Sequence, residues 1–337
     1  MVPLSEPQLI CLTPCKDEAW VIDTFLAAAS TWADYIVVGD QMSTDGTREI
    51  VRRYPKAILV DNHGTGYDEG EYRRVVLERA RQISGPKILL SIDADEVLSA
   101  NWMESEEWRR LRSLPVGTAI YGEWVNVDPG FKTGWPLGGP FIVGYVDDGI
   151  IGHSPGKFHI SRLLPPLDAP QFYLREIRLL HYQYTDPQRS RSKARNYQVQ
   201  EWLEKPERPI RLYRRLRPRE SVKPSDVMRL REEWFKGYDK LGIDIRKIHV
   251  DGMYRWDRLV LEALVKHGPA HFRKLDIWDV SWADMARAHG IAVPPGGLAD
   301  PRSGFDKLVL HFLRLTQPCM SQPAVRVCQQ LLRPLGW

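Results

Sequence analysis

The 337-residue sequence has few cysteines and no long apolar run, and each absence excludes a class of protein. Four cysteines are too few and too scattered for a disulfide framework. Cys11 and Cys15 have no second Cys or His pair nearby, so reduced thiols are expected and not a zinc site. No stretch reaches the roughly 18 apolar residues of a membrane-spanning helix. The polar, Pro-rich start at residues 1–7 does not resemble a signal peptide, so a cytoplasmic protein is expected.

Two nucleotide-binding signatures are also missing. The turn after the first predicted strand, residues 13–17, has no Gly-x-Gly-x-x-Gly, and no Walker loop occurs in the chain. The glycines of residues 63–70 follow the third predicted strand at the wrong spacing and predict a connector loop. The net charge of +4 does not by itself call for nucleic acid, and no nucleic-acid partner is expected.

Strand and helix patterns alternate through the first hundred residues. This order predicts an α/β fold, a mostly parallel sheet with helices on both faces. A Gly-, Pro- and Trp-rich loop is expected at 132–140, and short amphipathic helices follow residue 205. We therefore expect a sheet-based domain over 1–204 and a helical C-terminal region over 205–337. The predicted strands of the repeating part are residues 8–12, 35–38, 56–60 and 87–92.

Each of these four strands ends in polar residues. The strand ends carry Thr13, Asp40-Gln41, Asp61 and the acidic run 93–96, which reads DADE. Ligands of parallel sheets bind beyond the carboxyl ends of the strands, so these side chains are expected at one edge. Carboxylates crowded this closely repel one another unless a cation lies between them. Mn²⁺ or Mg²⁺ is the expected cofactor, because hard divalent cations take oxygen ligands and substrate phosphates.

The motifs at these strand ends resemble those of family 2 glycosyltransferases of the GT-A fold. The matching stretches are 13–18 (TPCKDE), 37–47 (VVGDQMSTDGT), Arg73 through Ala80, and 90–96 (LSIDADE). The likeness covers residues 7–100 well and 101–204 loosely. It implies nucleotide-sugar binding by 7–100, acceptor binding and catalysis by 101–204, a UDP-sugar donor and an acceptor that the sequence does not identify.

The resemblance assigns roles to individual residues. Asp95 would hold the metal, Asp93 would lie nearer the ribose, and Glu96 would be either a support for these ligands or a third one. Gln41 replaces an Asp that commonly pairs with the nucleotide base, which leaves the identity of the base open. Further possible metal ligands are Asp93 and one of the two histidines His159 and His181. The implied nucleotide-sugar contacts are Thr13, Pro14, Lys16, Glu18, Asp40, Gln41, Ser43, Arg73, Asp93 and Ala94.

An inverting transferase needs a carboxylate that deprotonates the acceptor hydroxyl. Asp147 and Asp148 form a like-charge pair, which raises one pKa and suits a base. Asp186 follows a predicted strand and opens a helix, at a spacing from Asp95 that is closer to the usual base of the family. We favour Asp148 among the three.

Two other functions remain open at this point. The acidic run also fits the Asp-x-Asp signature of haloacid-dehalogenase phosphohydrolases, with Asp93 as nucleophile. A non-catalytic nucleotide-binding or membrane-scaffold protein is the other alternative. The basic segment 189–219 would then lie on anionic lipid at the inner face of the membrane or contact nucleic acid, although such a charge run is usually a solvated face.

Overall fold

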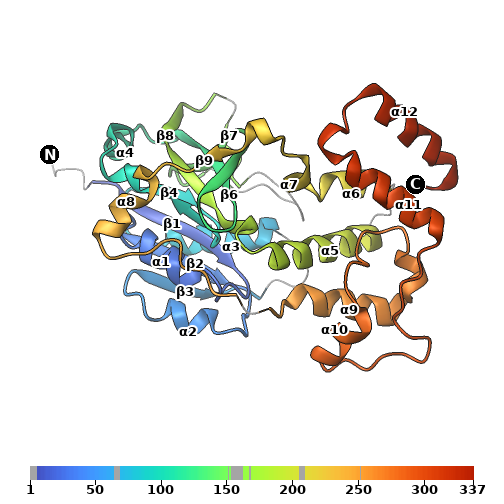
Figure 1. The fold of residues 1–337 in the computed structure, drawn as a ribbon. Coiled ribbons are helices and arrows are strands. Elements are labelled where there is room, and N and C mark those ends of the chain that lie inside the picture. The colour runs from blue at the N-terminus through green and yellow to red at the C-terminus, as the bar shows by residue number, and fades with distance from the viewer. Residues whose placement is uncertain are drawn as a thin grey trace. The chain divides into compact units, whose positions relative to one another are not determined.

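The computed structural model of the protein divides the chain into two compact units (Figure 1). The first unit contains residues 1–185 and 228–250, and the second contains 186–227 and 251–337. The structure describes residues 6–63, 69–150, 152, 162–166, 168–204, 209–250 and 252–337.

Four parallel strands make one half of the sheet of the first unit. Their spatial order is β3-β2-β1-β4, so β1 lies between β2 and β4. A strand–helix–strand crossover links each strand to the next, as predicted, and the α/β class is confirmed. The bounds are β1 (Gln8–Cys15), β2 (Tyr35–Asp40), β3 (Ala57–Asp61) and β4 (Lys87–Ser91).

The other half of the sheet is mixed. β7 pairs antiparallel with β4, β6 pairs antiparallel with β7, and β8 runs parallel to β6. The prediction of a loop at 132–140 is wrong, because residues 133–140 belong to the 14-residue β7 and residues 134–137 pair with β6. Gly and Pro are rare in strands, so they mask this one although its partner directly precedes it in the chain. The bounds are β5 (Glu96–Leu98), β6 (Ala119–Val127), β7 (Thr133–Val146), β8 (Gln171–His181) and β9 (Met228–Arg229).

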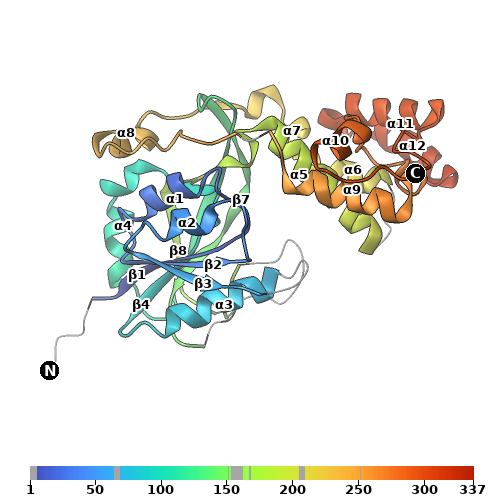
Figure 2. The same ribbon diagram turned by 90° about the horizontal axis from the view of Figure 1, so that it is seen from below.

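Helices cover both faces of the parallel half. The period-two alternation of β1 sends Leu9 and Cys11 to one face and Ile10 and Leu12 to the other. The first face packs against α1 and α4, and the second packs against α3, which lies on the opposite side of the sheet from α1 in Figure 2. The bounds are α1 (Ile22–Ala29), α2 (Thr47–Val51), α3 (Glu69–Arg81), α4 (Glu106–Arg110) and α8 (Glu233–Lys240).

The second unit is helical. Leu261 and Leu264 of α9 pack with Val199 of α5, and Leu310 and Leu313 of α11 pack in a separate cluster with α6. Ser303 and Asp306 form a capping box that starts α11. The bounds are α5 (Pro187–Glu204), α6 (Pro209–Arg215), α7 (Pro218–Ser221), α9 (Arg255–His267), α10 (Trp282–Ala288), α11 (Gly304–Leu315) and α12 (Pro323–Leu332).

The division between the units differs from the predicted boundary at 204/205. The chain leaves the first unit between Thr185 and Asp186, where a short turn runs directly into α5 without any change in composition. It returns at 228–250, because Trp234, Phe235 and Tyr238 of α8 are buried in a core with residues of the first unit. Neither crossing coincides with the predicted boundary.

Candidate active site

Asp40 is a fully buried carboxylate at the end of β2. The register of the sheet places it beside Cys15 on β1 and Asp61 on β3. Its Oδ2 accepts hydrogen bonds from the backbone N–H of Ser43 (3.0 Å) and from Arg48 Nη1 (2.7 Å). Arg48 also donates to Asp61 (2.6 Å) and lowers the pKa of that carboxyl through the hydrogen bond and its charge. The sequence did not single out Arg48, which balances the buried charge of Asp40.

The turns after β1 and β2 are joined by polar contacts. Lys16 Nζ donates to the carbonyl oxygen of Gln41 (2.6 Å), and the backbone N–H of Asp17 donates to Ser43 Oγ (2.7 Å). Glu18 follows in the same turn, and its backbone N–H donates to Thr47 Oγ1 (2.8 Å). Most of the predicted nucleotide contacts in these turns are therefore neighbours, and the network fixes the shape of the strand-end surface.

The end of β1 is also tied to the end of β4. Thr13 is fully buried beyond the middle of β1, and its hydroxyl donates to the carbonyl oxygen of Ile92. Pro14 pairs in register with Gly39 of β2, and Ala94 is buried in the turn that follows β4. The structure thus brings the carboxyl ends of β1, β2 and β4 together at one edge, as the alternating pattern predicted.

Asp93 is held by two arginines. Arg73 of α3 donates from Nη2 to Asp93 Oδ1 (3.1 Å) and from Nη1 to Ser91 Oγ (3.0 Å). Arg162 Nη2 donates to the other oxygen of Asp93 (3.0 Å). Burial alone would raise the pKa of Asp93, but the charges of Arg162 and Arg73 outweigh it and hold the pKa well below its ordinary value. Asp93 is therefore a fixed carboxylate whose charge is already balanced.

Glu96 has no exposed surface and is enclosed by hydrogen-bond donors. Arg162 donates to both of its oxygens, Trp124 Nε1 donates to Oε1 (2.7 Å), and the backbone N–H of Asp93 donates to Oε2 (3.0 Å). The Arg162 guanidinium lies 5.2 Å from the ring centres of both Trp124 and Phe141. Glu96 has no free lone pair directed outward, so it orders the site and does not serve as a third metal ligand.

Arg162 was missed by the sequence reasoning. It follows a stretch that matches no motif, and its hydrogen-bond acceptors lie in β4, in the turn after β4 and in β5. A lone arginine in an irregular segment carries no periodic signal. Only the fold brings it next to three acceptors at once, and only the burial of Glu96 explains why a cation is needed there.

Asp95 lies in the turn directly before β5, beside His181 at the end of β8. Glu96 of β5 lies opposite His181 of β8, and the backbone N–H of Tyr182 donates to the carbonyl oxygen of Asp95 (2.8 Å). The distance from Asp95 Oδ2 to His181 Nε2 is 3.7 Å, and Nδ1 lies 2.7 Å from Asn126 Oδ1. With the Asn126 amide oxygen facing Nδ1, that nitrogen carries the proton, and Nε2 is the ring atom that faces the carboxylate.

Asp95 and His181 could together hold a divalent cation. Carboxylate oxygens and imidazole nitrogens are both metal ligands, and the Asn126 contact fixes the ring as outer partners of metal-bound histidines do. No group of three or more His, Cys, Asp or Glu suited to a metal occurs in the described part of the chain. A cation held by this pair would need further oxygen ligands from water or substrate phosphates.

Asp147 and Asp148 do not lie at this edge. β7 runs antiparallel to β4, so its last residues meet the first residues of β4, and the backbone N–H of Asp147 donates to the carbonyl oxygen of Lys87. The side chain of Asp147 accepts from Arg81 (3.0 Å) and from the hydroxyl of Tyr145 (3.1 Å). The preference for Asp148 as base is therefore not supported by its position, because the direction of β7 was not predictable from the residues alone.

Asp186 belongs to the second unit, where it caps α5. Its Oδ1 accepts from the backbone N–H groups of Gln188 (2.9 Å) and Arg189 (3.1 Å), the pattern of an N-cap. Its Oδ2 accepts from the hydroxyl of Tyr254 (2.7 Å). His159 lies outside the described residues.

Several arginines of the basic segment 189–219 form ion pairs within the second unit. Arg195 pairs with Asp257 (2.7 Å) and Asp279 (2.9 Å), and Arg217 pairs with Asp276. Arg189 is buried against the ring of Trp256. These contacts leave fewer charges for a membrane or nucleic acid than the sequence suggested. Among the described helices, none has the length and apolar character needed to cross a membrane.

Comparisons with known proteins give distant structural likenesses. No protein-family model matches the chain, and no curated protein sequence matches it. Mannosyl-3-phosphoglycerate synthase from Rubrobacter xylanophilus is 17% identical with a TM-score of 0.28, over 37% of this chain and 41% of that one. Glucosyl-3-phosphoglycerate synthase from Mycobacterium tuberculosis, solved with Mn²⁺, UDP and glucosyl-3-phosphoglycerate, is 18% identical with a TM-score of 0.26, over 37% and 45%.

A third likeness is to 4-diphosphocytidyl-2C-methyl-D-erythritol synthase, 12% identical with a TM-score of 0.26, over 77% of this chain and 98% of that one. The chain spans less than half the length of the two phosphoglycerate-linked enzymes. Likenesses at this level assign no activity, which has to come from the geometry of the strand-end cluster.

Proposed function

We propose that the protein is a metal-dependent glycosyltransferase that moves a sugar from a nucleotide-sugar donor to an acceptor hydroxyl. The observation that carries the proposal is the Asp95–His181 pair, 3.7 Å apart, at the strand-end edge that also bears Thr13, Asp40 and Asp93. A nucleoside diphosphate suits this edge, because parallel strands bind ligands at their carboxyl ends and a divalent cation there would bridge phosphates.

The donor is expected to lie across the turns after β1, β2 and β4. Asp93, fixed by Arg73 and Arg162, is suited to accept a hydrogen bond from a ribose hydroxyl, because its lone pairs are held in one orientation. Gln41 is expected near the base. The resemblance of the sequence motifs makes uracil the first base to test.

Asp95 and His181 would hold Mn²⁺ or Mg²⁺, and this cation would neutralise the charge that develops on the departing diphosphate. The chain's own residues prepare the site for it. Asn126 keeps His181 Nε2 directed at Asp95, and the Tyr182 backbone N–H holds the Asp95 carbonyl. Arg162 keeps Asp93 and Glu96 apart from the metal by binding both carboxylates.

Inversion at the anomeric carbon requires a base outside this cluster, because Asp93 and Glu96 are occupied by arginines. Asp147 and Asp148 lie at the other end of β4, and Asp186 caps α5 in the second unit and accepts from the Tyr254 hydroxyl, so the base is assigned to none of the three.

The phosphohydrolase alternative is less well supported. A nucleophilic Asp93 needs a free oxygen, and both of its oxygens accept from guanidinium groups. The absence of phosphatase activity on a generic phosphoester with Mg²⁺ is the expected result. A non-catalytic nucleotide-binding protein would bind the donor but not turn it over.

The decisive experiment separates metal binding from turnover. Isothermal titration with Mn²⁺ should show binding to the wild-type protein that is lost in Asp95→Asn and weakened in His181→Gln, with Asp148→Asn as the matched acidic control. Thermal unfolding with UDP-, GDP- and dTDP-sugars and Mn²⁺ then identifies the donor, because a ligand at about 100 times its Kd stabilises by about 2.7 kcal/mol. Unchanged Mn²⁺ binding or unchanged sugar transfer in Asp95→Asn would refute the proposal.

A further inference from the structure

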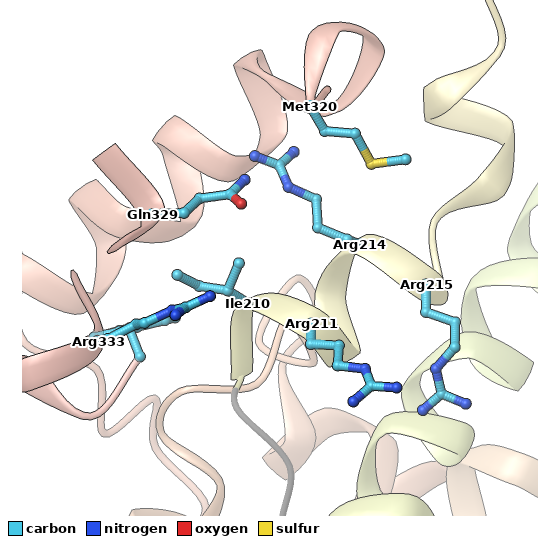
Figure 3. Close-up of a pocket in the computed structure, with 8 residues that line it drawn as sticks. Ile210, Arg211, Arg214, Arg215, Met320, Gln329 and Arg333 are labelled. Atoms are coloured by element: carbon cyan, nitrogen blue, oxygen red, sulfur yellow. The ribbon is translucent and has the colours of Figure 1, made fainter. Parts of the chain in front are cut away.

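The second unit contains a pocket that the proposed function does not use. Its volume is about 660 Å³, within the range of small-molecule sites. Figure 3 shows the contributing side chains, which come from α6, from α12 and from the segments beside α12. No acidic side chain is among the lining residues, which are Ile210, Arg211, Arg214, Arg215, Met320, Gln329, Arg333 and Trp337.

Arg214 is a fixed cation whose contacts are neutral. Nη1 donates to the carbonyl oxygen of Leu313 (2.7 Å) and to Gln317 Oε1 (2.8 Å), and Nη2 donates to Thr316 Oγ1 (2.6 Å). With its amide oxygen turned toward Arg214, Gln329 accepts from Nε and Nη2. Within the described ranges, no carboxylate forms an ion pair with Arg214. Burial lowers its pKa, as expected for a guanidinium surrounded by neutral groups.

Further positive charge lies around the same pocket. Arg333 is exposed at the end of α12, and in the part of the chain that the structure describes it forms no ion pair. Arg215 is paired with Glu201. The cations of the pocket therefore exceed the anions near it, and an anion would be attracted to it.

The rest of the lining is apolar. Ile210 and Trp337 are buried and Met320 is partly exposed, so the pocket offers an apolar wall beside its arginines. Its volume exceeds what an inorganic anion needs. The expected ligand therefore has an anionic end and an apolar portion.

We propose that this pocket binds an organic phosphate, with the phosphate at the arginines and an apolar portion against Ile210, Met320 and Trp337. Guanidinium groups suit phosphate because their paired N–H donors match its oxygens. The same chemistry occurs in a soluble phosphomonoester and in the headgroup of an anionic lipid. The inference is independent of the transferase proposal, because every lining residue belongs to the second unit.

The test uses the full chain in EDTA, so that no divalent cation supports binding at the strand ends. Isothermal titration with butyl phosphate is compared with inorganic phosphate and with butanol. Sedimentation with phosphatidic acid vesicles, against phosphatidylcholine vesicles, forms the second arm. Butyl phosphate is expected to bind more tightly than inorganic phosphate, and butanol is expected not to bind. Binding in the vesicle arm alone would identify a lipid headgroup as the source of the phosphate.

Arg333→Gln and Arg211→Gln are each expected to weaken binding about tenfold, the usual effect of losing one hydrogen bond to a charged group. Arg287→Gln, an exposed arginine of α10 outside the pocket, is the matched control and should bind as the wild type does. Arg73→Gln should also bind normally, which separates this site from the strand-end cluster. Wild-type affinity in both pocket variants, or no binding in either arm, would overturn the inference.

Discussion

Replacing Arg162 by Met tests whether the strand-end cluster depends on one buried cation. Arg162 is 5% exposed and donates to the carbonyl oxygen of Ser91 (2.6 Å), to Asp93 (3.0 Å) and to both oxygens of Glu96. Met replaces the apolar stem of Arg162 but not the guanidinium, which also lies against Trp124 and Phe141. The substitution therefore removes the charge, its hydrogen bonds and its contact with the two rings.

The expected loss of stability is about 3 kcal/mol. Removing one partner of a buried ion pair usually costs about 3–5 kcal/mol, because it leaves a buried charge without compensation. Two contacts of Glu96 remain, from Trp124 Nε1 and from the Asp93 backbone N–H, and Asp93 keeps Arg73. These remaining donors place the loss at the lower end of that range.

Urea denaturation followed by tryptophan fluorescence measures the loss as a shift of the transition of the first unit. Arg109→Met, an exposed ion-pair partner on α4, is the control and should change stability by less than about 0.5 kcal/mol. Adding Glu96→Gln to Arg162→Met should restore about 1–2 kcal/mol, because it removes the unpaired buried charge. A loss below about 1 kcal/mol in Arg162→Met would refute the reasoning.

The pH dependence gives an independent check. The pKa of Asp93 is lowered in the folded protein, so its contribution is complete above the unfolded value of about 3.9 and is lost as the pH falls through the folded value. The stability difference between wild type and Arg162→Met should therefore be full at pH 7 and shrink below about pH 4. A difference that stays constant from pH 7 to pH 3 would contradict the assigned charge interaction.

Three further outcomes are expected. Asp147→Asn should lower stability by about 1–3 kcal/mol, because it weakens the ion pair with Arg81, but it should leave sugar transfer unchanged. Loss of sugar transfer in this variant would make Asp147 a candidate for the catalytic base again. Gly144→Ala should cost about 1–3 kcal/mol, because its Cβ would lie 2.3 Å from the Leu89 carbonyl oxygen, whereas Gly139→Ala on the same strand has open space. Met42→Gly should stabilise the folded protein by up to about 1 kcal/mol, because Met42 has a φ of +57° and its side chain is 46% exposed. Thermal unfolding measures the change, and a lower melting temperature would show that the Met42 side chain packs in the folded protein.

The predictions from sequence were most accurate where they rested on local periodicity. Apolar runs that end in polar residues identified the four parallel strands and the edge where Thr13, Asp40 and Asp93 gather. Arg73, a predicted site residue, donates a hydrogen bond to Asp93. This contact was predictable because α3 and the strand that precedes Asp93 are consecutive in the chain. His181 was named as one possible ligand among others, and its register with Glu96 distinguishes it from the rest.

Other features depend on long-range information that no local pattern carries. The antiparallel direction of β7 sends Asp147 and Asp148 to the opposite end of β4, and no local pattern encodes strand direction. The return of residues 228–250 to the first unit depends on the burial of α8 aromatic residues, not on composition. The charge run 189–219 was visible, but its partners are distant in the sequence.

The sequence alone determined the α/β alternation and the acidic end of β4, because side-chain period and strand-end polarity are local properties of the chain. The tertiary structure decided what each carboxylate does. Arg162 balances Asp93 and Glu96, which leaves Asp95 to face His181. The physical reason is that the charge state of a buried carboxylate and its free lone pairs depend on neighbours brought together only by folding.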